Sequence, residues 1–188
     1  MSVDYYVAVH QASWPTAAAL QSCMDERKYP VVLAHAPAQP FSVKLGTLEA
    51  RFRGRFVELE ANVVQLSPTV SYSYSFDRPP DSSENIPHVG KVEVYKLRPD
   101  EKWKGNDINA DLARIGAKGV RFANGDYVLT LSFHSSTDEV RAGSYIMAAM
   151  IKCFGGYGFE FQGGSHGAGG FADDLVNEAA DDKLWKQP

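Results

Sequence analysis

The chain has 188 residues, of which 44% are hydrophobic and 22% charged, and this composition excludes disordered, fibrous and membrane-spanning classes. The formal net charge of -4 argues against a nucleic-acid binder that works through a basic face. Most of this charge belongs to the C-terminal segment, and the rest of the chain is nearly neutral.

The first elements predicted along the chain are a strand, a helix and a second strand. Residues 5–9 are rich in strand-forming side chains, and the helix after them begins at either Ser13 or Thr16, since both can cap a first turn. A second strand is expected over residues 29–33, followed by a loop over residues 34–40.

The middle of the chain has the period of two that is typical of half-buried strands. Apolar side chains occupy the even positions of residues 47–52 and the odd positions of residues 57–63. A turn or bulge at Gly54 explains this reversal, because one extra residue moves every later side chain to the other face. In such a hairpin, we expect the arginines of the first strand to face glutamates of the second.

A further alternation covers residues 70–76. It places Tyr72 and Tyr74 on one side of a strand, where they either line the core or form an exposed aromatic stripe. Residues 77–87, with three prolines and no periodicity, predict a loop. A strand over residues 91–97 is expected to follow it.

The last part of the chain repeats the order of the first. After a short helix over residues 107–115, we expect a buried strand over residues 126–133, a buried helix between Ser136 and Gly155, and a strand over residues 157–162. Because two strand-helix-strand units can arise independently, internal duplication stays an open alternative.

These elements predict an α+β fold, with a largely antiparallel sheet of about six to eight strands and three or four helices packed mostly on one side. We expect a single domain over residues 1–188, with two halves, 1–76 and 88–188, as the alternative. Cys23 and Cys153 belong to no Cys-x-x-Cys pair, and the N-terminus does not resemble a signal peptide. We therefore expect a cytoplasmic protein with two free thiols.

Patterns that would indicate catalysis or metal binding are weak. The histidines are scattered singly, so we expect no metal and no cofactor. His10 and His134 each follow a strand, and they would face each other if those strands were neighbours. Together with the glycine-rich loop from Gly163 to Gly170, they support one alternative, a small-ligand or metal-dependent enzyme. The loop lacks the glycine spacing of a nucleotide-binding motif.

The C-terminal helix is expected to bury an apolar stripe and to present acids on its other face. These acids form either an ordinary solvated face or a surface that binds a partner. Together with Tyr72 and Tyr74, the candidate partner-binding residues are the five acids Asp173, Asp174, Glu178, Asp181 and Asp182.

Two stretches carry a resemblance to a known class. The opening Asp4-Tyr-Tyr-Val-Ala-Val strand with the Trp14-Pro-Thr helix start, and the strand, alanine-rich helix and Gly-Gly element between Tyr127 and Gln162, resemble small bacterial immunity-type proteins and uncharacterised α+β proteins found beside polymorphic toxins. The resemblance implies a non-enzymatic, cytosolic inhibitor that occupies the active site of a toxin. The nearly neutral body is a departure, because it does not fit a strongly basic nuclease as the target.

We therefore expect a protein-binding module whose partner is a cognate toxin or effector. Neither nucleic acid nor a membrane is expected as a partner, and the chain is expected to be a monomer or a homodimer. A third alternative is a structural subunit whose aromatic strand pairs with itself.

Overall fold

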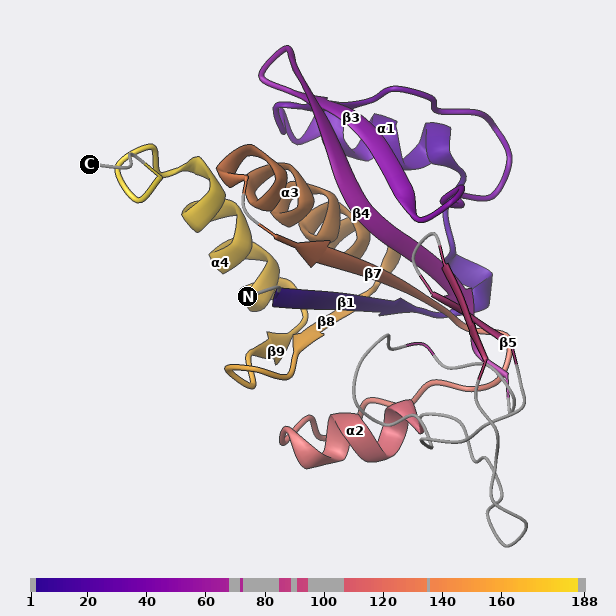
Figure 1. Ribbon diagram of the computed structural model, residues 1–188. Helices are drawn as coiled ribbons and strands as arrows, with labels where there is room; N and C mark the ends of the chain where they lie inside the picture. The colour runs from indigo at the N-terminus through magenta and orange to yellow at the C-terminus, as the bar shows by residue number, and fades with distance from the viewer. Residues whose placement is uncertain are drawn as a thin grey trace, which may run out of the picture.

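The computed structural model describes residues 3–67, 72, 85–88, 91–94, 107–134 and 136–185, and within 85–88 and 91–94 it describes the backbone. These residues form a seven-stranded sheet, a separate two-stranded ribbon and four α-helices (Figure 1). The large sheet contains β1 (Val3–Val9), β2 (Val31–Leu33), β3 (Thr47–Phe52), β4 (Arg55–Gln65), β7 (Tyr127–Phe133), β8 (Tyr157–Glu160) and β9 (His166–Gly167). The ribbon pairs β5 (Asn85–His88) with β6 (Lys91–Val94). The helices are a short 3-10 turn, η1 (Gln11–Ser13), and α1 (Ala17–Glu26), α2 (Ile108–Arg114), α3 (Thr137–Phe154) and α4 (Gly169–Ala180).

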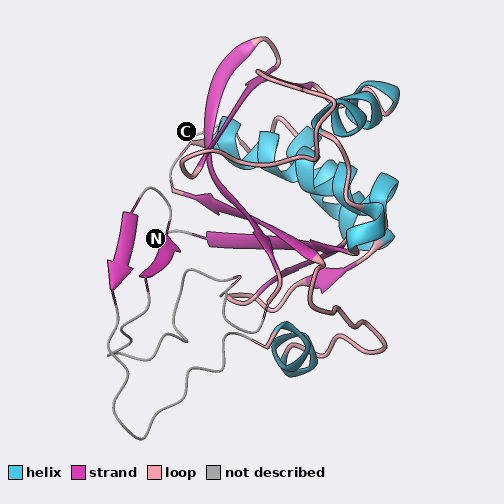
Figure 2. Ribbon diagram, turned by 90° about the vertical axis from the view of Figure 1, so that its right-hand side faces the viewer, coloured by secondary structure: helices cyan, strands magenta, loops and turns pink. Residues whose placement is uncertain are grey.

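The strand order of the large sheet is β2-β3-β4-β7-β1-β8-β9, and all its neighbouring strands are antiparallel. Helices α1, α3 and α4 cover one face of the sheet, and α2 lies against the other (Figure 2). The predicted α+β class, with a largely antiparallel sheet and helices mostly on one side, is confirmed. Among the described residues, no helix is both long and apolar enough to cross a membrane.

Two crossovers through helices connect strands that are not neighbours in the sheet. The chain leaves β1 through α1 and returns at β2, whereas it leaves β7 through α3 and returns at β8, on the far side of β1. Strand β8 lies next to β1, on the side away from β7. If the first unit were equivalent, β2 would lie next to β7 on the side away from β1, but β4 lies there and β2 is at an edge of the sheet. The two strand-helix-strand units predicted from the sequence therefore do not occupy equivalent places.

Local signals in the sequence set several element boundaries. Thr16 is the cap of α1, because its Oγ1 accepts a hydrogen bond from the Ala19 amide at 3.0 Å. Helix α3 ends at Gly155, which takes the left-handed conformation with φ of 67°. The β3–β4 turn is formed by Arg53 and Gly54, both with positive φ, as a two-residue hairpin requires.

The pairing predicted across this hairpin is wrong. The register places Glu49 opposite Glu58 and Arg51 opposite Phe56. A tight two-residue turn fixes this register, and in this register no arginine of β3 lies directly opposite a glutamate of β4.

The predictions for residues 70–84 lie outside the described residues except at Tyr72. Within residues 77–87, which were predicted to be a loop, the last three residues belong to strand β5. The strand predicted over residues 91–97 is present as β6 over its first four residues.

The structure also corrects the prediction of free thiols. Cys23 of α1 and Cys153 of α3 form a disulfide, with Cα atoms 6.4 Å apart. Helices α1 and α3 pack side by side on the same face of the sheet. Helix-to-helix packing brings the two cysteines together, and spacing in the sequence carries no sign of it.

Candidate functional site

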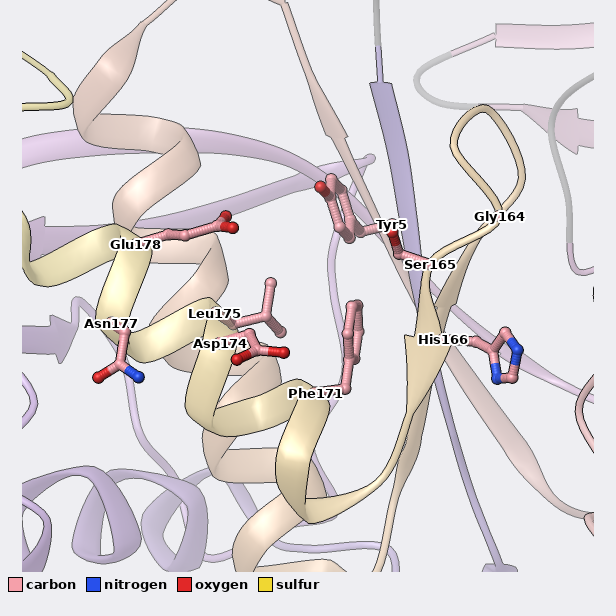
Figure 3. Close-up of a pocket in the computed structure, with 9 residues that line it drawn as sticks. All are labelled: Tyr5, Gly164, Ser165, His166, Phe171, Asp174, Leu175, Asn177 and Glu178. Atoms are coloured by element: carbon pink, nitrogen blue, oxygen red, sulfur yellow. The ribbon is translucent and has the colours of Figure 1, made fainter.

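A surface hollow of about 550 Å³ lies between β1, the β8–β9 loop and α4 (Figure 3). We call it the α4 hollow. Its lining comprises Tyr5, Gly164, Ser165, His166, Phe171, Asp174, Leu175, Asn177 and Glu178. The hollow therefore combines two of the candidate acids with part of the glycine-rich loop and a side chain of the first strand.

One wall of the hollow is aromatic. Figure 3 shows the Phe171 ring between α4 and the strands, and the Tyr5 ring beside it. Phe171 fits against the sheet because β8 and β9 carry glycines beneath it: a Cβ at Gly158 would lie 2.6 Å from a Phe171 ring carbon, and one at Gly167 would lie 2.9 Å from the Phe171 Cβ. These two glycines let the start of α4 approach the sheet closely.

The Tyr5 hydroxyl is held in its protonated form. Burial raises its pKa above the ordinary value, and the negative charges of Glu160 and Glu178 raise it further. Tyr5 is therefore a neutral hydrogen-bond group next to the acids of the hollow.

The glycine-rich loop is tied to a carboxylate of the protein itself. Glu160, at 4% exposure, accepts hydrogen bonds from the Gly163 amide at 2.8 Å and the Ser165 amide at 2.9 Å. In a nucleotide-binding loop, amides of this kind would point toward a phosphate. Here they satisfy a buried carboxylate, so they are not directed at a ligand.

His166 contributes little of its side chain to the hollow. Its ring points away from the other lining residues (Figure 3), and its Nδ1 lies 2.6 Å from the Tyr157 hydroxyl. Besides the Tyr5 hydroxyl, the polar side chains that remain at the hollow are those of Ser165, Asp174, Asn177 and Glu178.

Three of the five candidate acids have partners within the chain. Asp173 pairs with Lys152 at 2.7 Å, and the Asp181 carboxylate accepts a hydrogen bond from the Lys183 amide at 2.8 Å. Asp182 pairs with two arginines, Arg53 and the buried Arg141. Hydrogen bonds from Arg141 and Arg53 hold the pKa of Asp182 below its ordinary value.

Asp174 and Glu178 differ from those three. They lie four residues apart on α4, both are exposed, and both line the α4 hollow. Within the described part of the chain, neither carboxylate forms an ion pair. Of the five acids selected from the sequence, these two are the ones that line the hollow and have no ion-pair partner among the described residues.

Tyr72 belongs to the core. It is 1% exposed, its hydroxyl donates to the Asp111 carboxylate, and its carbonyl accepts a hydrogen bond from Thr130 Oγ1 at 3.2 Å. Burial, together with that carboxylate, raises the pKa of the phenol. The sequence left open whether these tyrosines line the core or form an exposed stripe, and Tyr72 lies in the core. Tyr74 lies outside the described residues.

The structure separates His10 from His134. Strands β1 and β7 are neighbours as the alternative required, but they run antiparallel, with Val9 opposite Tyr127 and Val3 opposite Phe133. The two histidines therefore lie at opposite ends of the strand pair, and the predicted facing pair is wrong.

Each histidine has a carboxylate of its own. His10 Nδ1 lies 3.0 Å from Asp126, and His134 Nε2 contacts Glu60. Among the residues that the structure describes, no group of three or more His, Cys, Asp or Glu side chains is arranged to hold a metal ion.

Four lining residues were not indicated as site residues by the sequence: Tyr5, Phe171, Leu175 and Asn177. Phe171 carried a partial signal, since it begins the apolar stripe expected on the C-terminal helix. Tyr5 carried none, because only the pairing of β1 with β8 brings it next to α4.

Comparisons with known proteins add nothing to this geometry: no family model, curated protein or solved structure matches the chain.

Proposed function

We propose that the chain is a non-enzymatic protein-binding module and that the α4 hollow is its contact surface. The observation that carries the proposal is the pair Asp174 and Glu178, two exposed carboxylates without an ion-pair partner among the described residues, set beside the Phe171 and Tyr5 rings. A lysine or arginine of a partner suits this surface, because its aliphatic stem packs on aromatic rings while its charge reaches the carboxylates.

The class of partner that we propose is a bacterial toxin or effector, which the chain would neutralise by binding to it. The resemblance to immunity-type proteins supports this choice. Acids on an exposed helix suit an inhibitor that covers a basic patch of its target, and charge complementarity of this kind gives fast and selective association.

The test uses charge reversal on the hollow. The tagged full chain is used to isolate its partner from the native host, and the affinity of the purified pair is then measured by calorimetry for the wild type and for Asp174→Lys/Glu178→Lys. We expect the double variant to weaken binding by at least about a hundredfold, because like charges then meet at the interface. A matched control, Asp25→Lys/Glu26→Lys, reverses two exposed acids at the end of α1.

The inhibitory role needs its own measurement. Expression of the partner alone should arrest growth of a host, and co-expression of the wild-type chain should restore it. Equal protection by wild type and Asp174→Lys/Glu178→Lys would contradict the proposed surface, and the absence of any stoichiometric protein partner would contradict the proposed function.

A small ligand is the second candidate occupant, because the volume of the hollow falls in the range of ligand sites, about 300 to 1,000 Å³. This candidate retains the glycine-rich loop of the enzyme alternative and gives up its histidine pair. Thermal-shift measurements with amines, nucleotides and metal ions distinguish the two candidates. A stabilisation by one ligand that Asp174→Asn/Glu178→Gln abolishes would favour the ligand.

The cytoplasmic location stays a prediction. The disulfide between Cys23 and Cys153 counts against it, because disulfides persist mainly in oxidising compartments. Fractionation of the native host, with the redox state of the chain trapped before lysis, measures both properties together.

A further inference from the structure

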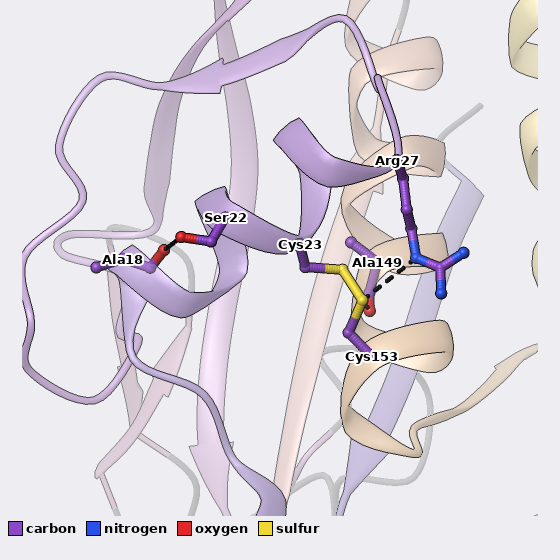
Figure 4. The surroundings of a disulfide bond; sticks show 6 residues. All are labelled: Ala18, Ser22, Cys23, Arg27, Ala149 and Cys153. Atoms are coloured by element: carbon purple, nitrogen blue, oxygen red, sulfur yellow. Dashed lines mark hydrogen bonds between the residues drawn. A yellow bond between two sulfur atoms is a disulfide. The ribbon is translucent and has the colours of Figure 1, made fainter.

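The two sulfur atoms of the disulfide have different surroundings (Figure 4). Cys23 is 4% exposed, and its Sγ lies 3.7 Å from the carbonyl oxygen of Ala149. Cys153, in the last turn of α3, is exposed. A reagent in solution can therefore approach the sulfur of Cys153, whereas packing shields that of Cys23.

A positive charge contacts the exposed sulfur. Arg27 Nε donates a hydrogen bond to Cys153 Sγ at 3.3 Å (Figure 4). Arg27 is placed there by α1 itself, since its amide donates to the Cys23 carbonyl at 3.1 Å. Its neighbours in the chain, Glu26 and Lys28, carry opposite charges, and the guanidinium is the charged group that contacts the sulfur.

We propose that this pair is a thiol-disulfide exchange site for small anionic thiols, with Cys153 as the attacked sulfur and Cys23 as the leaving and resolving sulfur. Arg27 is the positioning residue: it attracts the incoming thiol and stabilises thiolate at Cys153. The proposal rests on the surroundings of the disulfide and is independent of the α4 hollow.

The exchange proceeds in two steps, each of which moves one disulfide bond. A thiolate RS⁻ attacks Cys153 Sγ, the bond between the two cysteines breaks, and Cys23 leaves as a thiolate that takes a proton from water. A second RS⁻ then attacks the R sulfur of the mixed disulfide and releases the Cys153 thiolate. In total, two thiols are oxidised to RSSR and the protein disulfide is reduced to two thiols, and the reverse reaction reforms it.

Exchange at Cys153 does not require α1 to leave the core. Leu20 and Met24, on the same helix as Cys23, are fully buried against the sheet and α3. These contacts hold Cys23 near Cys153 after the bond opens, which is what a resolving cysteine needs.

The test measures reduction of the oxidised full chain by three small thiols that differ in charge: 2-mercaptoethanesulfonate, 2-mercaptoethanol and cysteamine. Rates are divided by the thiolate concentration of each reagent, because their pKa values differ. At low ionic strength we expect the anionic thiol to react at least about fivefold faster than the cationic one, and salt should reduce this ratio. Arg27→Gln should bring the ratio close to one, and Arg27→Lys should restore it.

The matched control is Arg121→Gln, which removes an exposed arginine elsewhere in the chain and should leave the ratio unchanged. A purely structural role of Arg27 would alter stability without altering the order of the three thiols. An unchanged order in Arg27→Gln would overturn the role given to this residue.

The position of attack is read from the trapped intermediate. After acid quenching, peptide mass spectrometry should find the mixed disulfide on Cys153. In single-cysteine variants, Cys153 of Cys23→Ala should react with glutathione disulfide at least about tenfold faster than Cys23 of Cys153→Ala. A mixed disulfide on Cys23, or two free thiols in the air-oxidised wild type, would overturn the proposal. Neither of these two measurements uses Arg27→Gln, so both can be made even if that variant does not fold.

Discussion

Single residues decide how α4 meets the sheet. Phe171 lies over two glycines, and the Gly158 position leaves no room for a methyl group, because a Cβ there would also lie 2.9 Å from Ile151. The aromatic wall of the α4 hollow thus depends on glycine at these positions of β8 and β9, because a side chain there would collide with Phe171.

Gly158→Ala should therefore lower the free energy of unfolding by about 1–3 kcal/mol, the usual range for overpacking a core. Urea denaturation measures this change. The control is Gly170→Ala in the first turn of α4, where a Cβ would meet no atom within 4 Å. It should be neutral or slightly stabilising, since alanine favours helix, and an equal loss in both variants would contradict the packing argument.

Asp126 holds the turn that precedes β7. It is 7% exposed, and its carboxylate accepts hydrogen bonds from the amides of Ala123 at 2.8 Å and Gln11 at 2.9 Å. Burial alone would raise the pKa of this carboxyl, but the hydrogen bonds from the two amides and His10 outweigh it and lower the pKa below 3.8. The folded state therefore binds the proton of Asp126 less readily than the unfolded state.

From this sign we predict how the stability of the wild type and Asp126→Asn differs with pH. Because the folded pKa is depressed, the stabilisation by Asp126 is fully present above its unfolded pKa and is lost as the pH falls through the folded pKa. Urea denaturation between pH 7 and pH 3 should show a constant advantage of the wild type down to about pH 5 and a shrinking one below it. An advantage that does not change over this range would contradict the account.

At the scale of elements, the edge strand β2 is closed by a side chain of α1. Gln21 Oε1 accepts from the Leu33 amide at 2.7 Å, and its Nε2 donates to the Val31 carbonyl at 3.2 Å. The amide of Gln21 thus takes the hydrogen bonds that another strand would otherwise make. An edge strand whose backbone groups lack such partners favours pairing between molecules.

Gln21→Ala should open this edge and cause association that increases with protein concentration. Light scattering over a concentration series measures it, with Ser22→Ala on the same helix as the control. If Gln21→Ala scatters like the control at every concentration, the edge is protected by something other than this side chain.

The elements also show what the sequence could predict. Alternation over residues 47–52 and the buried run of residues 126–133 are local patterns, and both became strands of the sheet. Contacts between elements leave no such local pattern in the sequence. The antiparallel pairing of β1 with β7 separated His10 from His134, and the packing of α1 on α3 joined Cys23 to its partner.

The same distinction applies to the candidate site. The acids of α4 were visible in the sequence as one face of a helix, but which of them are neutralised depends on Lys152 and Arg141 of α3 and on Arg53 of the β3–β4 turn. The aromatic wall depends on the pairing of β1 with β8. Both follow from the assembled sheet and its helices, which no single segment encodes.

At the scale of the whole molecule, the disulfide links positions 130 residues apart. A crosslink over so long a loop restricts the unfolded chain strongly, and its removal typically costs about 2–5 kcal/mol. Cys23→Ser/Cys153→Ser should therefore unfold at lower urea concentration than the oxidised wild type. The reduced wild type should match the double variant, and equal midpoints for oxidised and reduced wild type would contradict this prediction.

The central claim is that the α4 hollow contacts a protein partner. Its most direct test places a photo-crosslinking amino acid at Asn177, which lines the hollow, and at Arg121 as an exposed control. After illumination of the native host, the account predicts a covalent adduct with one protein from position 177 and none with that protein from position 121. No adduct from position 177, or the same adduct from both positions, would contradict it.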